Sequence, residues 1–285
     1  MNNYRMTSFF LIPLLLVACG KETRKPNIPE PHPPQQKEYT FGAAASWADE
    51  FDYEGLPDED KWGYDVGTGS SGWGNNELQY YTEKRIENAR VGNGVLTITA
   101  IKEGHEGSAY TSARLVSRGK ADFLYGRFEV RAKVPQGVGT WPAAWMLPTD
   151  WKYGGWPASG EIDVLEHVGY DQDRVHISVH TEAYNHVIGT QKTASKKIEK
   201  ATTEFHLYRV DWTPAYIRGY VDDVQIFNFQ NEGSGYKAWP FDQKFHWLLN
   251  LAVGGNWGGV EGVDEAAFPA RMEVDYVRVY PLIEN

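Results

Sequence analysis

The chain has 285 residues, of which 41% are hydrophobic and 23% charged, so it can bury a substantial core. Its net charge of −10 argues against nucleic acids and anionic membrane surfaces as partners, because both attract basic patches. Aromatic residues make up 14%, including 11 Trp and 17 Tyr, and such flat faces suit sugar rings as well as interfaces. We therefore expect a neutral partner and a monomeric protein.

The N-terminus has the layout of a secretory signal peptide. Arg5 precedes the apolar run FFLIPLLLVA, which ends at Cys19, the only cysteine in the chain. An apolar run of about ten residues is too short for a membrane-spanning helix, which needs roughly 20. A buried structural cysteine is the commoner situation in general, but it does not explain a thiol directly after this run.

The sequence LVAC at residues 16–19 resembles a bacterial lipobox. We therefore expect residues 1–18 to be a lipoprotein signal peptide and Cys19 to be lipidated, which would anchor the protein to a membrane. Lys21 and Glu22 also resemble a surface-export signal of Bacteroidetes lipoproteins. Together these features predict an outer-membrane lipoprotein exposed at the cell surface.

Residues 19–40 form a Pro-rich linker that contains NIPEPHPPQQ, a composition typical of an extended spacer. Residues 41–285 contain neither an internal repeat nor a second linker, so we expect a single domain there. Strand patterns dominate it, each rich in β-branched or aromatic residues and bounded by turn-forming residues. The predicted strands are 94–101, 126–134, 175–181, 208–213, 217–227, 246–253 and 272–280.

Long helical periodicity is nearly absent from this domain, whereas strands follow one another at short spacing. Such a pattern predicts an all-β fold, either a two-sheet sandwich or a jelly roll. Within the segment 217–227, the sequence VDDVQ at 221–225 is typical of a hairpin turn.

The sequence GEIDVLEHVG at residues 160–169 places Glu161, Asp163 and Glu166 within six positions. In a helix, Glu161 and Glu166 would lie about 140° apart around the axis, too far to cooperate. In a regular strand, Glu161 and Asp163 share one face and Glu166 falls on the other. A β-bulge between them would add one residue and return Glu166 to the first face, and bulges are frequent beside active sites.

With a bulge, Glu161 and Glu166 would be roughly 13 Å apart at their Cα atoms. Their carboxyl groups could then approach the ~5–5.5 Å separation of retaining glycoside hydrolases. Asp163, between them, could hold a proton bridge to Glu161 and raise the pKa of its neighbours by charge repulsion. The plainer alternative is a solvated edge strand, which the apolar neighbours at 162, 164, 165 and 168 disfavour.

The acidic stretch is similar to the bulged E-x-D-x-x-E signature of glycoside hydrolase family 16, laminarinase-like branch. Further similarity lies in GWGNNELQYYT (72–82), YTSARL (110–115), GRFEVRAKVP (126–135), GTWPAAWMLP (139–148) and GGNWGG (254–259), and so spans about residues 41–281. The resemblance implies a concanavalin A-like β-jelly roll of two antiparallel sheets whose concave sheet forms the substrate cleft. It also implies Glu161 as nucleophile, Glu166 as acid/base and Asp163 as assisting carboxylate. The unbulged E-x-D-x-E of plant transglycosylases and lichenases differs from this sequence.

Four tryptophans are candidates for stacking on sugar rings. Trp141 and Trp145 share one face of a strand, Trp156 precedes the acidic stretch, and the resemblance places these three and Trp257 in the cleft. Core packing is the alternative for each of them, because aromatic burial dominates protein cores.

The resemblance also suggests that Asn75, Glu77 and Arg114 contact sugar hydroxyls. The alternatives are turn formation for Asn75 and a surface ion pair for the other two. His176 and His180 are too far apart on a strand, about 13 Å, to bind one zinc ion. We expect His180 to be a hydrogen-bonding cleft residue and assign no role to His176 or His167.

No cofactor is expected to be required for catalysis, but relatives carry a structural calcium ion. By resemblance, its ligands would be backbone oxygens of Glu50 and Gly94 and the carboxylate of Asp275. The alternative for Asp275 is an exposed strand carboxylate.

The function that the sequence predicts is endo-acting, retaining hydrolysis of β-1,3-glucan or mixed-linkage β-1,3-1,4-glucan, such as laminarin or cereal β-glucan. One alternative is a surface glycan-binding lipoprotein without catalytic activity, which the complete set of three acids disfavours. The other is a galactanase of the same family that cuts agar, porphyran or carrageenan. Sulfated chains would favour a basic cleft, and this chain is acidic.

Overall fold

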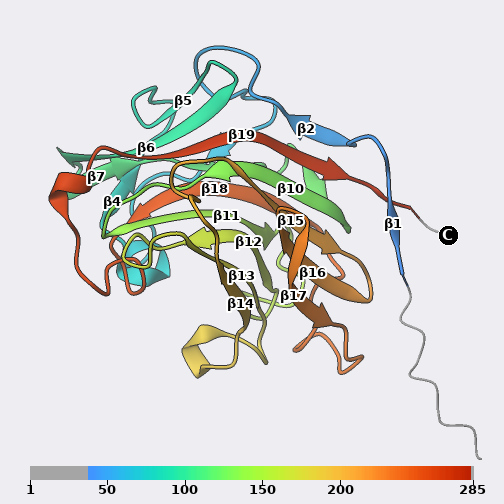
Figure 1. Cartoon of the computed structure of the whole chain (residues 1–285). Helices are drawn as coiled ribbons and strands as arrows, with labels where there is room; N and C mark the ends of the chain where they lie inside the picture. Colours follow the sequence, from blue (N-terminus) through green and yellow to red (C-terminus); the bar gives the residue numbers. More distant parts are fainter. Residues whose placement is uncertain (1–37, 284–285) are drawn as a thin grey trace, which may run out of the picture. The chain divides into compact units, whose positions relative to one another are not determined.

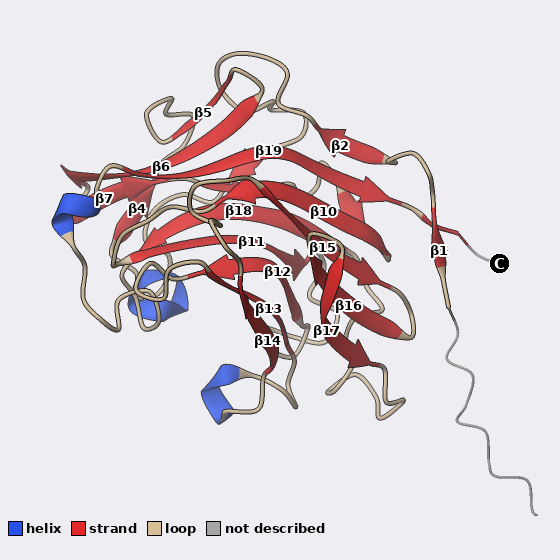
Figure 2. Ribbon diagram, viewed as in Figure 1, coloured by secondary structure: helices blue, strands red, loops and turns tan. Residues whose placement is uncertain are grey.

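The computed structural model describes residues 38–283, whose regular secondary structure is almost wholly β-strand, arranged mainly in two large stacked sheets (Figures 1 and 2). The predicted signal peptide, Cys19, and the linker up to residue 37 lie outside the described residues. Within the described part of the chain, no helix is both long and apolar enough to cross a membrane. The predicted all-β sandwich is confirmed.

The sheet that carries the acidic stretch has eight strands. Their order is β14 (Lys192–Lys197), β13 (Arg174–His180), β12 (Glu161–His167), β11 (Thr140–Pro148), β18 (Phe245–Val253), β8 (Arg114–Val116) and β3 (Gly63–Tyr64), with β9 (Asp122–Phe123) also paired to β18. All of these pairs are antiparallel.

The second sheet has ten strands. Their order is β17 (Val224–Gln230), β16 (Tyr216–Val221), β15 (His206–Trp212), β10 (Gly126–Lys133), β19 (Ala270–Tyr280), β6 (Val95–His105), β7 (Ser108–Ser112) and β4 (Gln79–Tyr81), with β2 (Trp47–Asp49) on β19 and β5 (Ala89–Gly92) on β6. One pair, β4 with β7, is parallel, so the expectation of purely antiparallel sheets is wrong at this edge.

The remaining elements are small. A two-stranded sheet joins β1 (Thr40–Phe41) to β20 (Leu282–Ile283), so both ends of the domain lie side by side (Figure 1). Three short helical segments occur within residues 38–283, namely η1 (Gly72–Asn76), η2 (His186–Ile188) and η3 (Glu265–Ala267).

The packed domain begins slightly earlier than predicted, at Glu38. We assigned residues 38–40 to the linker, but Glu38 forms a bidentate ion pair with Arg218 on β16, at 2.8 and 3.0 Å, and Thr40 belongs to β1. These contacts tie the last linker residues to the domain, and polar composition alone could not reveal them.

The core lies between the two large sheets and follows the two-residue alternation of the strands. On β11, Ala144 and Met146 belong to it, whereas Trp141 and Trp145 are half-buried on the opposite face. Strand β18 is buried at all nine positions, because one face meets the core and the other is covered by polar and aromatic side chains. One face of the eight-stranded sheet therefore packs against the core, and the opposite face carries the candidate site residues.

Six of the predicted strands are present with their ends shifted by a few residues, and the predicted segment 217–227 forms two strands, β16 and β17. The predicted hairpin turn joins β16 to β17, where Asp222 and Asp223 both have positive φ, 48° and 63°. Two consecutive positive φ values are typical of the tight turns that match strand twist, and Asp tolerates them better than most residues.

Candidate active site

The predicted β-bulge is present in β12. Asp163 lies opposite Ser178 of β13 and Glu166 opposite His176, so three steps on β12 correspond to two on β13. The register of β12 against β11 shifts at the same place. The extra residue brings Glu166 to the face that carries Glu161 and Asp163.

Cross-strand partners share a face of a sheet, so the register defines which side chains accompany the three acids. We call this side of the eight-stranded sheet the catalytic face. One row of partners crosses it through Ser195, His176, Glu166, Ala143, Asn250 and Arg114. A second row runs through Thr193, Ser178, Asp163, Trp145, Leu248 and Val116.

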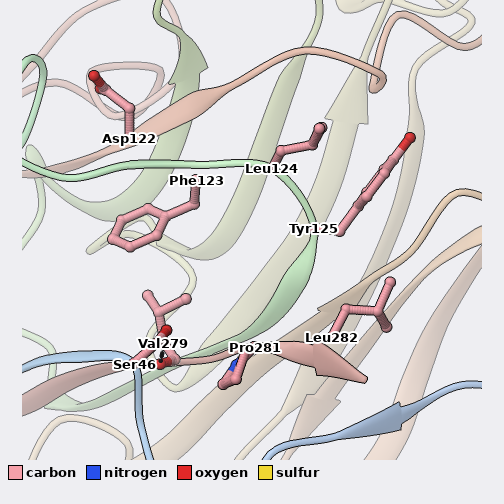
Figure 3. A pocket seen from close by; sticks show the side chains of 8 residues that line it. All are labelled: Ser46, Asp122, Phe123, Leu124, Tyr125, Val279, Pro281 and Leu282. Atoms are coloured by element: carbon pink, nitrogen blue, oxygen red, sulfur yellow. Dashed lines mark hydrogen bonds between the residues drawn. The ribbon is translucent and has the colours of Figure 1, made fainter. Parts of the chain in front are cut away.

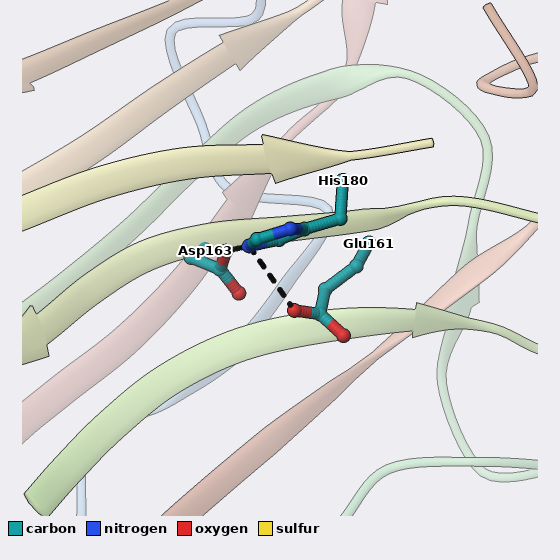
Figure 4. Close-up of side chains that lie close together, drawn as sticks. All are labelled: Glu161, Asp163 and His180. Atoms are coloured by element: carbon teal, nitrogen blue, oxygen red, sulfur yellow. Dashed lines mark ion pairs between the residues drawn. The ribbon is translucent and has the colours of Figure 1, made fainter. Parts of the chain in front are cut away.

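His180 lies between two of the acids (Figure 4). Its Nε2 atom is 3.7 Å from Oε1 of Glu161 and 3.5 Å from Oδ2 of Asp163. Asp163 is buried, and its Oδ2 has no hydrogen-bond partner among the described residues. We expected Asp163 to bridge directly to Glu161, but no hydrogen bond joins them in the described chain, and the imidazole faces both carboxyl groups instead.

Each of the two predicted catalytic glutamates accepts a hydrogen bond from a tryptophan indole. Nε1 of Trp156 donates to Oε2 of Glu161 at 2.9 Å, and Nε1 of Trp141 donates to Oε1 of Glu166 at 3.2 Å. Trp257 packs edge-on against Trp141, with ring centroids 5.4 Å apart. These tryptophans lie beside the predicted catalytic glutamates, and two of them are hydrogen-bond donors to them.

Burial is the main cause of the raised pKa values of the acids. It raises the pKa of Glu161 to about 8, with the charge of Asp163 as the next cause. The pKa of Glu166 is raised to about 8 for the same two reasons, and that of Asp163 is raised well above its usual range by burial. The indole hydrogen bonds act in the opposite direction and favour the ionised glutamates. Such perturbed carboxyl groups, close together on one face, are suited to proton transfer.

Glu161, Asp163 and His180 also have ligand atoms within 4.8 Å of one another, the kind of group that could hold a metal ion. We interpret the group as part of a proton-transfer cluster, because it shares one face of the sheet with Glu166 and because indoles donate to both glutamates.

A hydrogen-bonded network extends from the acids towards β4. Nε1 of Trp145 donates to Oδ1 of Asn250 at 2.7 Å, and Nδ2 of Asn250 donates to the hydroxyl of Tyr81 at 3.0 Å. Glu77 accepts from Gln79 at 2.7 Å, from Tyr81 at 3.3 Å and from Asn75 at 3.2 Å. The predicted pair Asn75 and Glu77 thus belongs to one network with Trp145.

Arg114 lies between two indole rings. Its guanidinium carbon is 4.4 Å from the ring centre of Trp73 and 4.9 Å from that of Trp145, and Nε is 3.1 Å from Oδ2 of Asp65. Arg114 is buried, so the alternative of an ordinary surface ion pair is wrong. A planar guanidinium fits such a sandwich, whereas the tetrahedral ammonium of a lysine does not.

Several residues of this face were missed by the sequence reasoning. Asn250, Tyr81, Trp73 and Asp65 connect the predicted sugar contacts. Trp73 and Tyr81 lie inside the motif 72–82 and Asp65 lies shortly before it, whereas Asn250 belongs to none of the motifs. Asn250 lies in the apolar run HWLLNLAV, where a polar residue at a buried position could have been noticed.

The two unassigned histidines have different surroundings. His167 is fully buried, and its Nε2 accepts a hydrogen bond from the backbone of Asp173 at 3.2 Å, a structural role in the turn after β12. His176 packs edge-on against Trp257 at 4.9 Å and lies opposite Glu166. His176 therefore belongs to the catalytic face.

The predicted calcium ligands come from the ten-stranded sheet. Register places them near one another, because Val274 pairs with Leu96 and Val277 with Asp49. The carboxylate of Asp275, however, accepts a bond from Arg131 at 2.5 Å, and Glu50 is held by Arg278. A calcium ion would have to displace Arg131 from Asp275, so the carboxylate of Asp275 is not free to bind the ion in this arrangement. Gly94 lies in the β5–β6 turn, and calcium binding stays a prediction.

A cavity of about 460 Å³ opens elsewhere, between the β9–β10 turn and the end of β19 (Figure 3). Its lining residues are Ser46, Asp122, Phe123, Leu124, Tyr125, Val279, Pro281 and Leu282. None of the predicted site residues is among them. The chemistry that we describe belongs to the open catalytic face rather than to this cavity.

A jelly roll with paired glutamates on a bulged strand, surrounded by tryptophans, defines a glycoside hydrolase. The chain belongs to the glycosyl hydrolases family 16, whose family model matches residues 74–278. It is 58% identical over 245 residues to a beta-glucanase of Rhodothermus marinus, a match that covers 84% of this chain and 85% of the relative. It is 35% identical over 287 residues to a glucan endo-1,3-beta-glucosidase of Cryptopygus antarcticus, with 94% and 97% covered.

Among solved structures, the X-ray structure of the laminarinase from Rhodothermus marinus superimposes with a TM-score of 0.83. The two sequences are 56% identical in this comparison, which covers 87% of this chain and all of the other. The predicted family and fold are therefore confirmed.

Proposed function

We infer that this protein is an endo-acting β-glucanase that hydrolyses β-1,3- or mixed-linkage β-1,3-1,4-glucan with retention of configuration. The observation that carries this inference is the bulge in β12, which brings Glu161, Asp163 and Glu166 to one face. Similarity to a beta-glucanase and to a glucan endo-1,3-beta-glucosidase supports the substrate class.

The reaction proceeds in two displacements. Glu166 donates a proton to the glycosidic oxygen while the carboxylate of Glu161 attacks the anomeric carbon, so the C–O bond breaks and the leaving chain departs as an alcohol. The ionised Glu166 then takes a proton from water, whose oxygen attacks the same carbon and releases Glu161. Two inversions give net retention.

The site must hold one proton on Glu166 and none on Glu161. With both pKa values raised to about 8, the pair tends to keep protons at neutral pH, and the groups titrate together. The contacts favour Glu161 as the ionised partner, because Nε2 of His180 lies 3.7 Å from its Oε1 and the indole of Trp156 donates to its Oε2 at 2.9 Å.

The tryptophans favour glucose over galactose. β-Glucose carries all its ring substituents in equatorial positions and presents flat C–H faces to an aromatic ring, whereas the axial hydroxyl of galactose disturbs that contact. Trp156 is 36% exposed, and Trp141 and Trp145 are half-buried on the same face, so each offers part of its ring.

Purified protein should be tested on laminarin, barley mixed-linkage glucan, cellulose, agarose and carrageenan. We expect internal cuts first in laminarin, in mixed-linkage glucan or in both, little action on cellulose, and intact galactans. NMR should show the β-anomer first. Equal activity on a galactan would contradict the glucan assignment, an α-anomer first would contradict retention, and binding without cleavage would favour the non-catalytic alternative.

We also propose that the protein is a lipid-anchored, surface-exposed lipoprotein of the outer membrane. The support is the sequence LVAC, which ends at Cys19. Cys19→Ala should abolish labelling by a fatty-acid analogue in the native host and leave glucanase activity intact, because the catalytic residues lie on strands of the separate domain. Unchanged labelling of the variant would refute the anchor.

A further inference from the structure

We propose that His186 is a positioning residue that fixes the two side chains in contact with the predicted nucleophile Glu161. This inference rests on the proposed glucanase function. It assigns a role to a residue that lies outside every motif used to predict the site.

Three aromatic rings form a cluster beside Glu161. The ring of His186 lies on that of Trp156, with centroids 5.1 Å apart at an angle of 37°, and meets the ring of His180 edge-on at 5.3 Å and 82°. Trp156 donates to Glu161 at 2.9 Å, and Nε2 of His180 lies 3.7 Å from the same carboxyl group. Trp156 and His180, which both lie beside the predicted nucleophile, therefore both pack against the imidazole of His186.

The loop that carries His186 is held by its own hydrogen bonds. Asn185 is buried, its Oδ1 accepts from the backbone of Ile188 at 3.3 Å, and its Nδ2 donates to the carbonyls of Thr181 at 3.1 Å and Glu182 at 3.3 Å. Ala183 is further bonded through its backbone nitrogen to the carbonyl oxygen of Lys237 at 2.9 Å. Segment η2 thus presents the imidazole from a fixed backbone.

Trp156 needs such support because its side chain is 36% exposed and comes from the long loop between β11 and β12. Without the imidazole, one face of the indole would lose its packing partner, and the ring would gain rotamer freedom. The hydrogen bond to Glu161 would then be populated only part of the time. Because that bond favours the ionised carboxylate, its loss disfavours the form of Glu161 that attacks.

The test compares His186→Ala with His186→Phe, which restores a flat ring without a charge. Val187→Ala is the matched control, since Val187 is the next residue of η2 and is 70% exposed. On laminarin we expect His186→Ala to lower kcat/KM about tenfold, mostly through kcat, His186→Phe to recover most of the loss, and Val187→Ala to match the parent.

The pH profile separates positioning from a merely structural role. Glu161 is faced by Asp163 and Glu166 from its own strand and by His180 from β13, and His186 of η2 contacts His180 in turn. Loss of the indole bond should move the acidic limb of kcat/KM to higher pH in His186→Ala and leave it in place in His186→Phe. The intrinsic fluorescence of Trp156, compared with a Trp156→Phe background, should report a more mobile ring in His186→Ala alone.

Three outcomes would overturn the proposal: parent-like kinetics for His186→Ala, failure of His186→Phe to restore activity, or an equal loss in Val187→Ala. The second would indicate that the charge or the hydrogen bonds of the imidazole matter instead of its ring. If the parent itself does not cut laminarin or mixed-linkage glucan, the glucanase assignment fails. The mobility of Trp156 would still decide whether His186 positions it.

Discussion

Glu161 and Glu166 accept matching hydrogen bonds, each from the indole of one tryptophan, at 2.9 Å and 3.2 Å. Trp156 comes from the loop before β12, and Trp141 comes from the neighbouring strand β11. Glu161 and Glu166 thus have the same kind of hydrogen-bond donor, but the two donor tryptophans belong to different segments of the chain. Their protonation can be changed one at a time by altering one tryptophan.

Trp141→Phe removes the donor to Glu166 but keeps an aromatic ring. Because this hydrogen bond lowers the pKa of Glu166, its loss should raise that pKa further. The acid must be protonated for the first displacement, so the basic limb of kcat/KM should move to higher pH. Kinetics on laminarin across pH measure this shift, with Trp145→Phe as the control, since its indole bonds to Asn250 instead. An unmoved basic limb would contradict the assigned role of Glu166.

Arg114→Lys should weaken glucan binding although it keeps the charge. The planar guanidinium fills the space between Trp73 and Trp145, and a lysine cannot stack in that way. We expect KM to rise about tenfold. Arg114→Ala should in addition lower the unfolding free energy by about 2 kcal/mol, because Asp65 loses a buried partner.

Arg118→Ala is the matched control for these variants. Arg118 faces the same carboxylate from 3.9 Å, but its side chain is 52% exposed. Its loss should change stability by less than about 0.5 kcal/mol. Equal effects of Arg114→Ala and Arg118→Ala in denaturant titrations would mean that burial between the indoles does not matter.

Glu161→Gln should stabilise the fold, and increasingly so as the pH rises. A carboxyl whose pKa is about 8 when folded and near 4.5 when unfolded binds more protons in the native state between those values. Stability then falls as pH rises through that window, by up to about 1.4 kcal/mol per pH unit. Glutamine does not titrate, so the melting temperature of the variant should exceed that of the parent more at pH 8 than at pH 5.

The exposed residue Glu199 provides the comparison for that experiment. Glu199→Gln should follow the parent at both pH values, because substitutions of exposed side chains change folding stability little. A constant difference between parent and Glu161→Gln from pH 5 to pH 8 would show that the pKa of Glu161 is not raised by burial.

Glu166→Ala should lose activity on laminarin by several orders of magnitude but retain much more on an aryl β-glucoside with a good leaving group. Such a substrate needs little help from an acid in the first step. Azide should replace water in the second step and give a glycosyl azide of β configuration. Product analysis by NMR checks the anomer, and equal losses on both substrates without azide product would assign Glu166 another role.

Much of the fold and of the acid cluster could be predicted because both depend on local patterns. Alternating apolar residues predict the strands. Glu161, Asp163 and Glu166 can lie on the same face of a strand only if that strand contains a β-bulge. The structure confirms that geometry. The hairpin at Asp222 and Asp223 likewise follows from its own sequence.

Contacts between segments far apart in the chain could not be read in this way. Arg114 meets Trp73 and Trp145 across three elements. Asn250 bonds to Trp145, 105 residues away in the chain, and to Tyr81, 169 residues away. The pairing of Asp275 with Arg131 depends on how β10 meets β19, which no local pattern specifies. His186 has no motif at all, and its place beside Trp156 follows from the folding of two loops.

The most direct test of the mechanism is to trap the covalent intermediate. A 2-deoxy-2-fluoro laminaribioside with a dinitrophenyl leaving group should slow the second displacement more than it slows the first, so the glycosyl group accumulates on the nucleophile. Intact mass spectrometry should show one added disaccharide, and peptide mapping should place it on Glu161. A label on Asp163 or Glu166, or continued turnover with release of the α-anomer and no label, would contradict the account.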